Sequence, residues 1–397
     1  MRSRIVRVAD KHLLIVANLM AAGCGTISGV LLTRGLGPAG RGELTAVVPI
    51  AVLLSSVSLL GLVDYVIWFT ARNRSFPGWS TIRKSQLIGL LLAVVTFCMV
   101  LTATIIRHPS TLWLAIIAVL SLPAMQTALI KQGYLLGVAR YKQLFVVRVL
   151  PQLIVLFAAL VFHYLSYFNV LLVGTVQLAA TAGVCLLFRT GGKSNSEQEE
   201  RDSQLVFKVS LPAWTAGLPA LALQRLDLLL VTILIPSTAQ IGFYSAAITL
   251  SALPQMVAQS IGMTIRASAV TAESKRRLLG FGADASIFCG FTMALMLAAP
   301  YIIPLLLGEN FRPAVTPSVL LLCAAIPLGL STLLAEEMIG FNKFRYVGRA
   351  WAIGAVLTAT LVASLIPILG IMGAALGCLT GYSITFIAML LFRSKLL

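Results

Sequence analysis

Two charged residues stand inside one of the longest apolar runs of the chain. Arg225 and Asp227 lie in a stretch from about 207 to 235 that is long enough to cross a bilayer. A charge at mid-membrane costs about 2.5 kcal/mol or more, so such side chains usually face a bundle interior or a water-filled path. Because helix residues turn by about 100° each, the two side chains point about 200° apart and cannot pair with each other. Each therefore needs another partner or water.

The composition indicates the elements that must hold these charges. Of the 397 residues, 59% are apolar and only 11% are charged, which is not the composition of a soluble domain. Apolar runs near 20 residues recur along the chain and predict an all-α integral membrane protein with about 12 transmembrane helices. The expected spans are 12–33, 44–70, 86–106, 111–136, 143–164, 168–188, 207–235, 240–265, 279–303, 314–338, 347–367 and 370–392.

The positions of Lys and Arg predict how these spans are oriented. With the N-terminus inside, most of the 30 basic residues fall in the inner segments, whereas the outer loops hold only Arg34, Arg41, Arg107 and Arg312. An asymmetry of this size predicts a multi-pass protein with both termini in the cytoplasm. It also explains the net charge of +17, so nucleic acid is not expected as a partner.

The chain is predicted to consist of two pseudo-symmetric six-helix lobes. The polar stretch 189–206 reads as a cytoplasmic linker between an N-terminal lobe, 1–188, and a C-terminal lobe, 207–397. Short segments recur in both halves: Gly42 corresponds to Gly242, and the Leu-Phe-Arg that ends at Arg189 corresponds to the one that ends at Arg393. Six helices in each half give repeats of the same orientation, and such bundles bind their substrate between the halves.

The same segments carry a family resemblance. The loop 32–42 (LTRGLGPAGRG), the stretch 223–227 (LQRLD) with 241–246 (IGFYSA), and the segments 307–311 (LGENF) and 367–375 (PILGIMGAA) are its landmarks. Together they resemble polysaccharide transporters and O-antigen flippases of the multidrug/oligosaccharidyl-lipid/polysaccharide exporter superfamily. The chain shows only the twelve core spans, without the additional lipid-groove helices of peptidoglycan-precursor flippases.

The resemblance implies a function. Members of this family flip oligosaccharides linked to a polyprenyl diphosphate across the bacterial cytoplasmic membrane, for export of surface polysaccharide such as O-antigen and lipopolysaccharide. Such a protein needs a hydrated cavity with cations to meet the diphosphate, and a guanidinium fork suits phosphate oxygens. Arg148, Arg225 and Lys131 are the expected substrate-binding cations, although Arg148 and Lys131 would also reach the membrane interface by snorkelling. A polysaccharide polymerase is an expected partner.

Two acids are expected to be buried, and two readings of them stay open. Asp64 and Asp227 are either sites for H⁺ or Na⁺ coupling, because a desolvated carboxylate favours a neutralising partner, or structural partners of other polar groups. The structural reading pairs Asp64 with Arg148 or Lys131, and Asp227 with a polar group of the first or eighth span.

A gate and a hinge are also predicted. Glu336 and Glu337 lie at the inner end of the tenth span, where they either close the cytoplasmic mouth through Lys131, Arg140 or Lys343 or neutralise basic loop residues. Gly25, Gly217 and Pro219 interrupt the first and seventh spans and serve either as hinges for alternating access or as close-packing positions.

An enzyme is not expected from this sequence. The outer loops are short and hold no acid pair and no Ser/His/Asp set, and the six cysteines are scattered singly without metal-ligand spacing. No catalytic residue, metal or cofactor is therefore predicted. The alternatives to a flippase are a cation-coupled drug or metabolite exporter of the same fold and, as a different class, a membrane enzyme of polysaccharide assembly.

Overall fold

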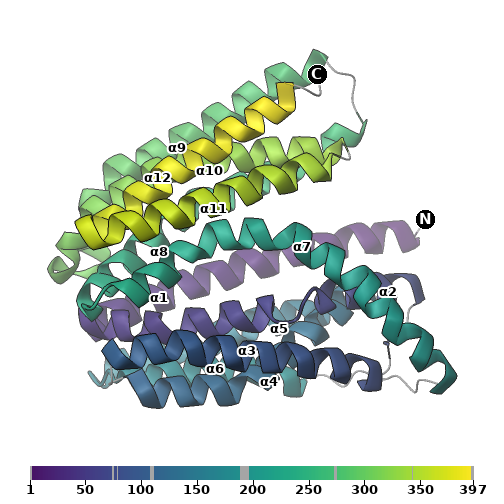
Figure 1. The fold of residues 1–397 in the computed structure, drawn as a ribbon, viewed down its shortest axis with the longest axis horizontal. Helices are drawn as coiled ribbons and strands as arrows, with labels where there is room; N and C mark the ends of the chain where they lie inside the picture. Colours follow the sequence, from purple (N-terminus) through teal and green to yellow (C-terminus); the bar gives the residue numbers. More distant parts are fainter. Residues whose placement is uncertain are drawn as a thin grey trace. The chain divides into compact units, whose positions relative to one another are not determined.

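The structure is a computed structural model that describes residues 2–73, 76–77, 79–107, 111–187, 196–271, 275–341 and 343–394. Helices account for nearly all of this part of the chain (Figure 1). They are α1 (Arg2–Val57), α2 (Leu62–Asn73), α3 (Trp79–Arg107), α4 (Leu112–Gly137), α5 (Tyr141–Tyr164), α6 (Val170–Leu187), α7 (Ser196–Leu234), α8 (Thr238–Thr271), α9 (Lys275–Leu307), the 3₁₀ helix η2 (Glu309–Ala314), α10 (Val315–Gly340), α11 (Phe344–Leu369) and α12 (Ile371–Ser394).

The described helices agree with the twelve predicted spans. Nine are long and apolar enough to cross a membrane, and the first of these, Val16–Val57, covers most of the first two predicted spans. A shorter apolar helix, Val170–Gly183, and α3 coincide with the remaining two. The predicted fold class, an all-α membrane protein of about 12 spans, is confirmed.

The connection between the first two spans is shorter than predicted. Instead of an outer loop at 34–43, α1 continues through this segment, and only Gly37 leaves helical geometry, with φ 69° and ψ 179°. Positive φ favours glycine, and the following Pro38 suits the first position of a new helix because it has no N–H to satisfy. The expected loop is therefore a kink between two helices.

The second predicted span, 44–70, is not one helix. It breaks at residues 58–61, where Leu60 and Gly61 both have positive φ, and restarts as α2. The break is held from other helices: the Trp214 indole N–H donates to the Val57 carbonyl at 2.8 Å, and the Gln126 amide donates to the Ser58 hydroxyl at 2.9 Å. These bonds replace some of the helix bonds that the break removes.

The chain divides into two compact units. One comprises Met1–Leu36 and Glu43–Thr215, and the other Gly37–Gly42 and Ala216–Leu397. The chain passes from the first to the second inside α7, which begins at Ser196 within the predicted linker 189–206. Residues 188–195 lie outside the described part, and the division into lobes 1–188 and 207–397 stays a prediction.

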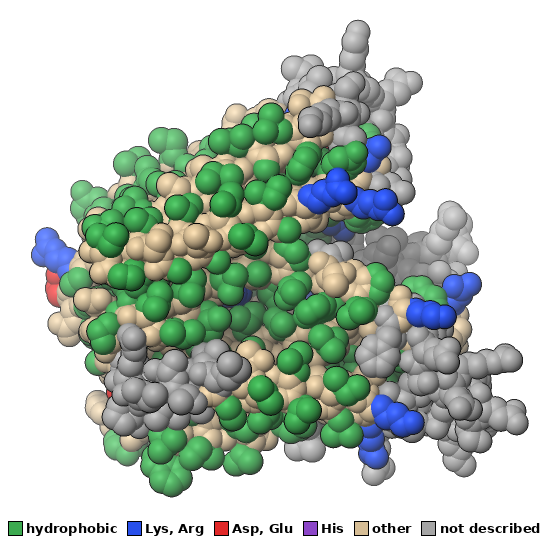
Figure 2. Space-filling view, in the orientation of Figure 1, with side chains coloured by type: hydrophobic (Ala, Val, Ile, Leu, Met, Phe, Trp, Pro, Cys, Tyr) green, Lys and Arg blue, Asp and Glu red, His purple; other side chains and the backbone are tan. Residues whose placement is uncertain are grey.

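Each unit has its own apolar core. In the second unit α10 packs on α8 and α12, and α11 runs beside α12 (Figure 1). Gly354, Gly377 and Gly381 bring α11 and α12 close, because a Cβ at any of them would overlap a neighbouring side chain or backbone. Hydrophobic side chains spread over the visible flanks of the units, while Lys and Arg gather near helix ends (Figure 2). This is the pattern of a protein surrounded by lipid.

Candidate functional site

Asp227 is at the centre of a buried polar cluster in the second unit. It lies on α7 with 5% of its surface exposed, and the fully buried Tyr244 of α8 donates its hydroxyl to Asp227 Oδ2 at 2.9 Å. Cys378 Sγ of α12 lies 3.7 Å from the same hydroxyl. Hydroxyl and thiol can each donate in this second contact.

A second tyrosine fixes the same turn of α7. Tyr382, one helical turn after Cys378 on α12, donates its hydroxyl to the carbonyl of Leu223 at 3.1 Å. Leu223 precedes Asp227 by one turn, so α8 and α12 both hold this part of α7. The sequence predicted a polar partner for Asp227 from the first or eighth span, and the structure places Tyr244 of α8 there.

One oxygen of this carboxylate is left without a partner. Asp227 Oδ1 is buried and accepts no hydrogen bond from the described residues. Buried polar atoms are nearly always hydrogen-bonded, so an orphan oxygen marks a position that a proton, a water molecule or a small cation would satisfy. Among the described residues no group of three or more His, Cys, Asp or Glu side chains is placed to hold a metal ion.

Arg225 differs from Asp227 in its exposure. It is exposed, whereas Asp227 two residues later is buried. The helical rotation that separates them therefore gives the two charges different surroundings, and no ion pair joins them among the described residues. Tyr244, Cys378 and Tyr382 were not singled out from the sequence as partners, because each is a common residue in an apolar run. The only signal was the resemblance of 241–246, which contains Tyr244.

A second polar group lies in the first unit, between α1 and α5. Arg148 is half-buried, and its guanidinium donates to the side-chain oxygen of the exposed Asn18. One turn further along α5, Gln152 Oε1 lies 3.2 Å from the place that a Cβ on Gly25 would occupy. Gly25 thus lies at a close approach of α1 to α5.

Asp64 does not pair with Arg148. It is exposed in the first turn of α2, and no ion pair joins it to another described residue. Arg148 contacts Asn18 in place of Asp64, and the predicted pairing of Asp64 with Lys131 stays a prediction. The break at 58–61 is one reason why Asp64 does not pair with Arg148, because it separates the rotation of α2 from that of the helix before it. Lys131 is half-buried on α4.

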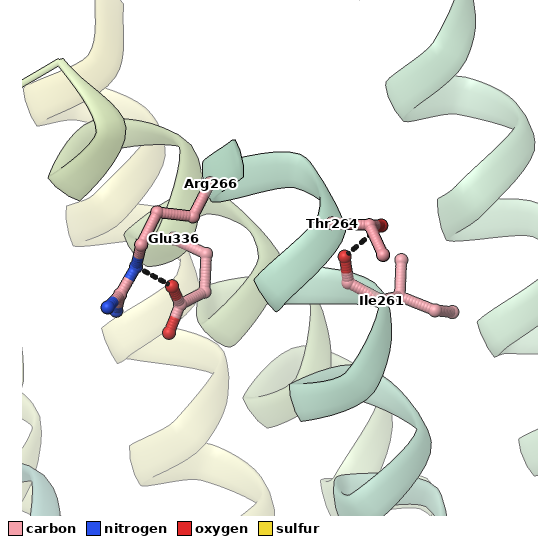
Figure 3. A network of polar contacts seen from close by, with 4 residues as sticks. All are labelled: Ile261, Thr264, Arg266 and Glu336. Carbon is pink, nitrogen blue, oxygen red and sulfur yellow. Dashed lines mark hydrogen bonds and ion pairs between the residues drawn. The ribbon is translucent and has the colours of Figure 1, made fainter. Parts of the chain in front are cut away.

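Glu336 and Glu337 each form an ion pair inside the second unit. Glu336 pairs with Arg266 of α8 (Figure 3). Glu337 pairs with Arg393 of α12, with Nη2 3.1 Å from Oε1 and Nε 2.9 Å from Oε2. These two arginines, which end their spans, were not among the partners that the sequence indicated.

The predicted hinge residues differ in their surroundings. Gly217 is exposed, with nothing within 4 Å of a Cβ built on it, and Pro219 is half-buried. The helix α7 continues through both. They lie immediately after the point between Thr215 and Ala216 where the chain leaves the first unit.

Fold and site together define a multi-pass, all-helical membrane protein with charged and polar groups inside its spans. Residues 8–266 match the family described as polysaccharide biosynthesis proteins, and the chain belongs to that family. No curated protein matches it in sequence.

Solved structures share its fold. The lipid II flippase MurJ, in an inward closed conformation, superimposes with a TM-score of 0.73 at 12% identity, over 97% of this chain and 87% of that one. An inward-facing multidrug resistance MATE family transporter of the MOP superfamily gives a TM-score of 0.69 at 15% identity, over 96% of this chain and 98% of that one. At such identities the likeness establishes the fold.

Proposed function

We propose that this chain is a flippase that moves a polyprenyl diphosphate-linked oligosaccharide across the bacterial cytoplasmic membrane by alternating access. The protein works in surface polysaccharide export, with both termini in the cytoplasm and a polysaccharide polymerase as a partner. Membership of the polysaccharide biosynthesis family and the flippase fold support this proposal.

The observation that carries the proposal is the pair of arginines within the spans. Arg148 of α5 is half-buried and oriented by Asn18, and Arg225 of α7 is exposed although it lies in the apolar span Gly217–Leu234. A guanidinium that faced hydrocarbon would be costly, so both side chains face water or a ligand. A diphosphate is the ligand that best matches permanently charged, fork-shaped donors. Lys131 adds a third cation to this set.

Asp227 is the proposed coupling acid. Its orphan Oδ1 is the position that H⁺ or Na⁺ would occupy, and Tyr244 and Cys378 connect the carboxylate to α8 and α12. Occupation of this oxygen would change the contacts of three helices of the second unit at once. Asp64, exposed in its own unit, is not assigned to coupling.

The conformational change is assigned to two places. Gly217 and Pro219 adjoin the passage of α7 between the units, and Gly25 lies where α1 approaches α5, so bending at these residues is the proposed hinge motion. Glu336 and Glu337 keep their proposed role at the inner gate, where breaking their ion pairs with Arg266 and Arg393 would open the second unit's end.

The test is a complementation assay in cells that lack this chain. R148A and R225A are expected to abolish surface polysaccharide while the protein still accumulates in the membrane. R312A is the matched control, because Arg312 lies outside the long apolar helices, in the 3₁₀ helix η2, with 78% side-chain exposure. Normal polymer output from both cavity variants would overturn the cationic-cavity assignment.

A cation-coupled drug or metabolite exporter is the second candidate, favoured by the buried Asp227. Uptake of labelled lipid-linked oligosaccharide into proteoliposomes distinguishes a flippase from such an exporter. The uptake is measured at several pH values with constant Na⁺, and at several Na⁺ concentrations with constant pH. We expect D227N to lose its dependence on one ion. Ion-driven efflux of cationic dyes without any lipid translocation would favour the exporter instead.

A further inference from the structure

The short helix α2 has two chemically different faces. One face is buried in the core of the first unit through Leu62, Tyr65, Val66 and Phe69. The other face is exposed and carries Asp64, Trp68 and Arg72, which follow one another at intervals of four residues. At 1.5 Å per residue these three side chains form one stripe about 12 Å long. An acid, an aromatic ring and a base are thus presented in a row on one surface.

The central ring of this stripe is held in place. The Arg72 guanidinium lies over the Trp68 ring, 5.6 Å from its centroid, and the ring of the buried Tyr65, on the same helix, has its centroid 6.4 Å from that of Trp68. Trp68 nevertheless stays 37% exposed. Because the opposite face of α2 is anchored in the core, the stripe is a rigid platform and not a mobile loop.

Trp68 lies between two exposed charged side chains, Asp64 and Arg72. Its neighbour Asp64 is an exposed carboxylate in the part of the chain expected within the membrane, where contact with hydrocarbon would be costly. By contrast, Trp113 of α4 is 67% exposed beside the exposed apolar side chains of Leu112 and Ile116. Trp113 therefore resembles the tryptophans that anchor a helix at the lipid interface, whereas Trp68 stands between an acid and a base on its stripe.

We propose that Asp64, Trp68 and Arg72 form a sugar-binding site that recognises the glycan of the translocated lipid. A pyranose presents an apolar face of C–H bonds that packs on the electron-rich face of an indole ring. Its hydroxyl groups donate to the Asp64 carboxylate and accept from the Arg72 guanidinium. A few well-placed polar groups around an aromatic surface are what orient a small polar ligand.

This inference rests on the proposed function and adds the part of the substrate that it leaves open. Arg148 and Arg225 would meet the diphosphate, whereas the α2 stripe would meet the sugars. The break at 58–61 is what turns α2 independently of the preceding helix, so the site depends on an irregularity of the backbone that Gly61, with φ 76°, permits.

The experiment measures binding to the full chain in nanodiscs. Two probes are compared: the glycan-bearing polyprenyl diphosphate extracted from cells that lack this chain, and undecaprenyl diphosphate without sugar. We expect the wild type to bind the glycan-bearing probe about tenfold more tightly. W68L should remove this preference, W68F should keep most of it, and D64N, which leaves the packing untouched, should reduce it.

The control and the contrary outcomes are defined by the same assay. W113L removes an indole that is even more exposed than that of Trp68 and should keep the full preference. Retention of the preference in both W68L and D64N would overturn the sugar site. A wild type that binds both probes equally would also overturn it and leave the diphosphate proposal standing, whereas a wild type that binds neither probe would remove the proposed function and the sugar site together.

Discussion

Gly42 and Gly242 lie against each other's flanking backbone. A Cβ on Gly42 would overlap the carbonyl oxygen of Thr238, and a Cβ on Gly242 would overlap the carbonyl oxygen of Pro38. The two glycines occupy equivalent positions in the sequence repeat, and so do Pro38 and Thr238. A reciprocal contact of this kind is what a two-fold relation between two segments produces. The two segments that the predicted repeat aligns therefore pack against each other inside the second unit, at the start of α8.

The first prediction concerns this contact. G242A should destabilise the protein by about 1–3 kcal/mol, because the added methyl group cannot be accommodated without moving backbone. The higher helix propensity of alanine offsets this loss of stability by at most about 1 kcal/mol. Thermal unfolding in detergent measures the effect. G290A is the control, since a Cβ there meets nothing within 4 Å in the middle of α9, and equal melting temperatures for both variants would contradict the contact.

Much of the fold could be predicted from the sequence because long apolar runs and the asymmetry of Lys and Arg are strong signals. The break at 58–61 could not be predicted. Leu59 and Leu60 continue the hydropathy of the run, and what stabilises the break is Trp214, far away in the chain. A local pattern does not contain such a partner.

The candidate site was only partly predictable for a related reason. A charge in an apolar run is visible in one sequence, so Asp227 and Arg148 could be named. Their partners could not, because Tyr244, Tyr382 and Asn18 become neighbours through the rotation of each helix about its axis. For Asp64 the same limit made Arg148 a candidate partner, although no ion pair joins these two residues.

The second prediction compares two ion pairs. Arg393 and Glu337 retain only 18% and 10% side-chain exposure, whereas Arg312 and Glu309 retain 78% and 75%. Removing one partner of a buried pair leaves an uncompensated charge, so E337Q should cost about 3–5 kcal/mol. E309Q should cost less than about 1 kcal/mol. Chemical denaturation measures the free energy of unfolding of both variants. Equal losses for E337Q and E309Q would show that Arg393 is solvated in the folded protein.

The third prediction concerns the break in the second span. W214F removes the indole N–H that bonds to the Val57 carbonyl and keeps most of the ring, so the loss should be about 1 kcal/mol. G61A should cost more, because Gly61 has positive φ and its Cβ would overlap the Ser210 carbonyl. Hydrogen exchange of α2 amides should rise in both variants. Unchanged exchange in G61A would show that the break does not depend on these contacts.

The fourth prediction is a double-mutant cycle on Asp227 and Tyr244. Y244F removes the hydroxyl that donates to Asp227 Oδ2. Hydrogen bonds to charged groups contribute about 1.5–3 kcal/mol, so the coupling between D227N and Y244F should fall in that range. Y382F supplies the comparison, because the bond it removes is made to the backbone carbonyl of Leu223 and not to the carboxylate. The coupling energy between D227N and Y382F should therefore be smaller. Equal coupling energies for the two tyrosines would contradict a specific Asp227–Tyr244 hydrogen bond and indicate that the cluster is coupled through its packing.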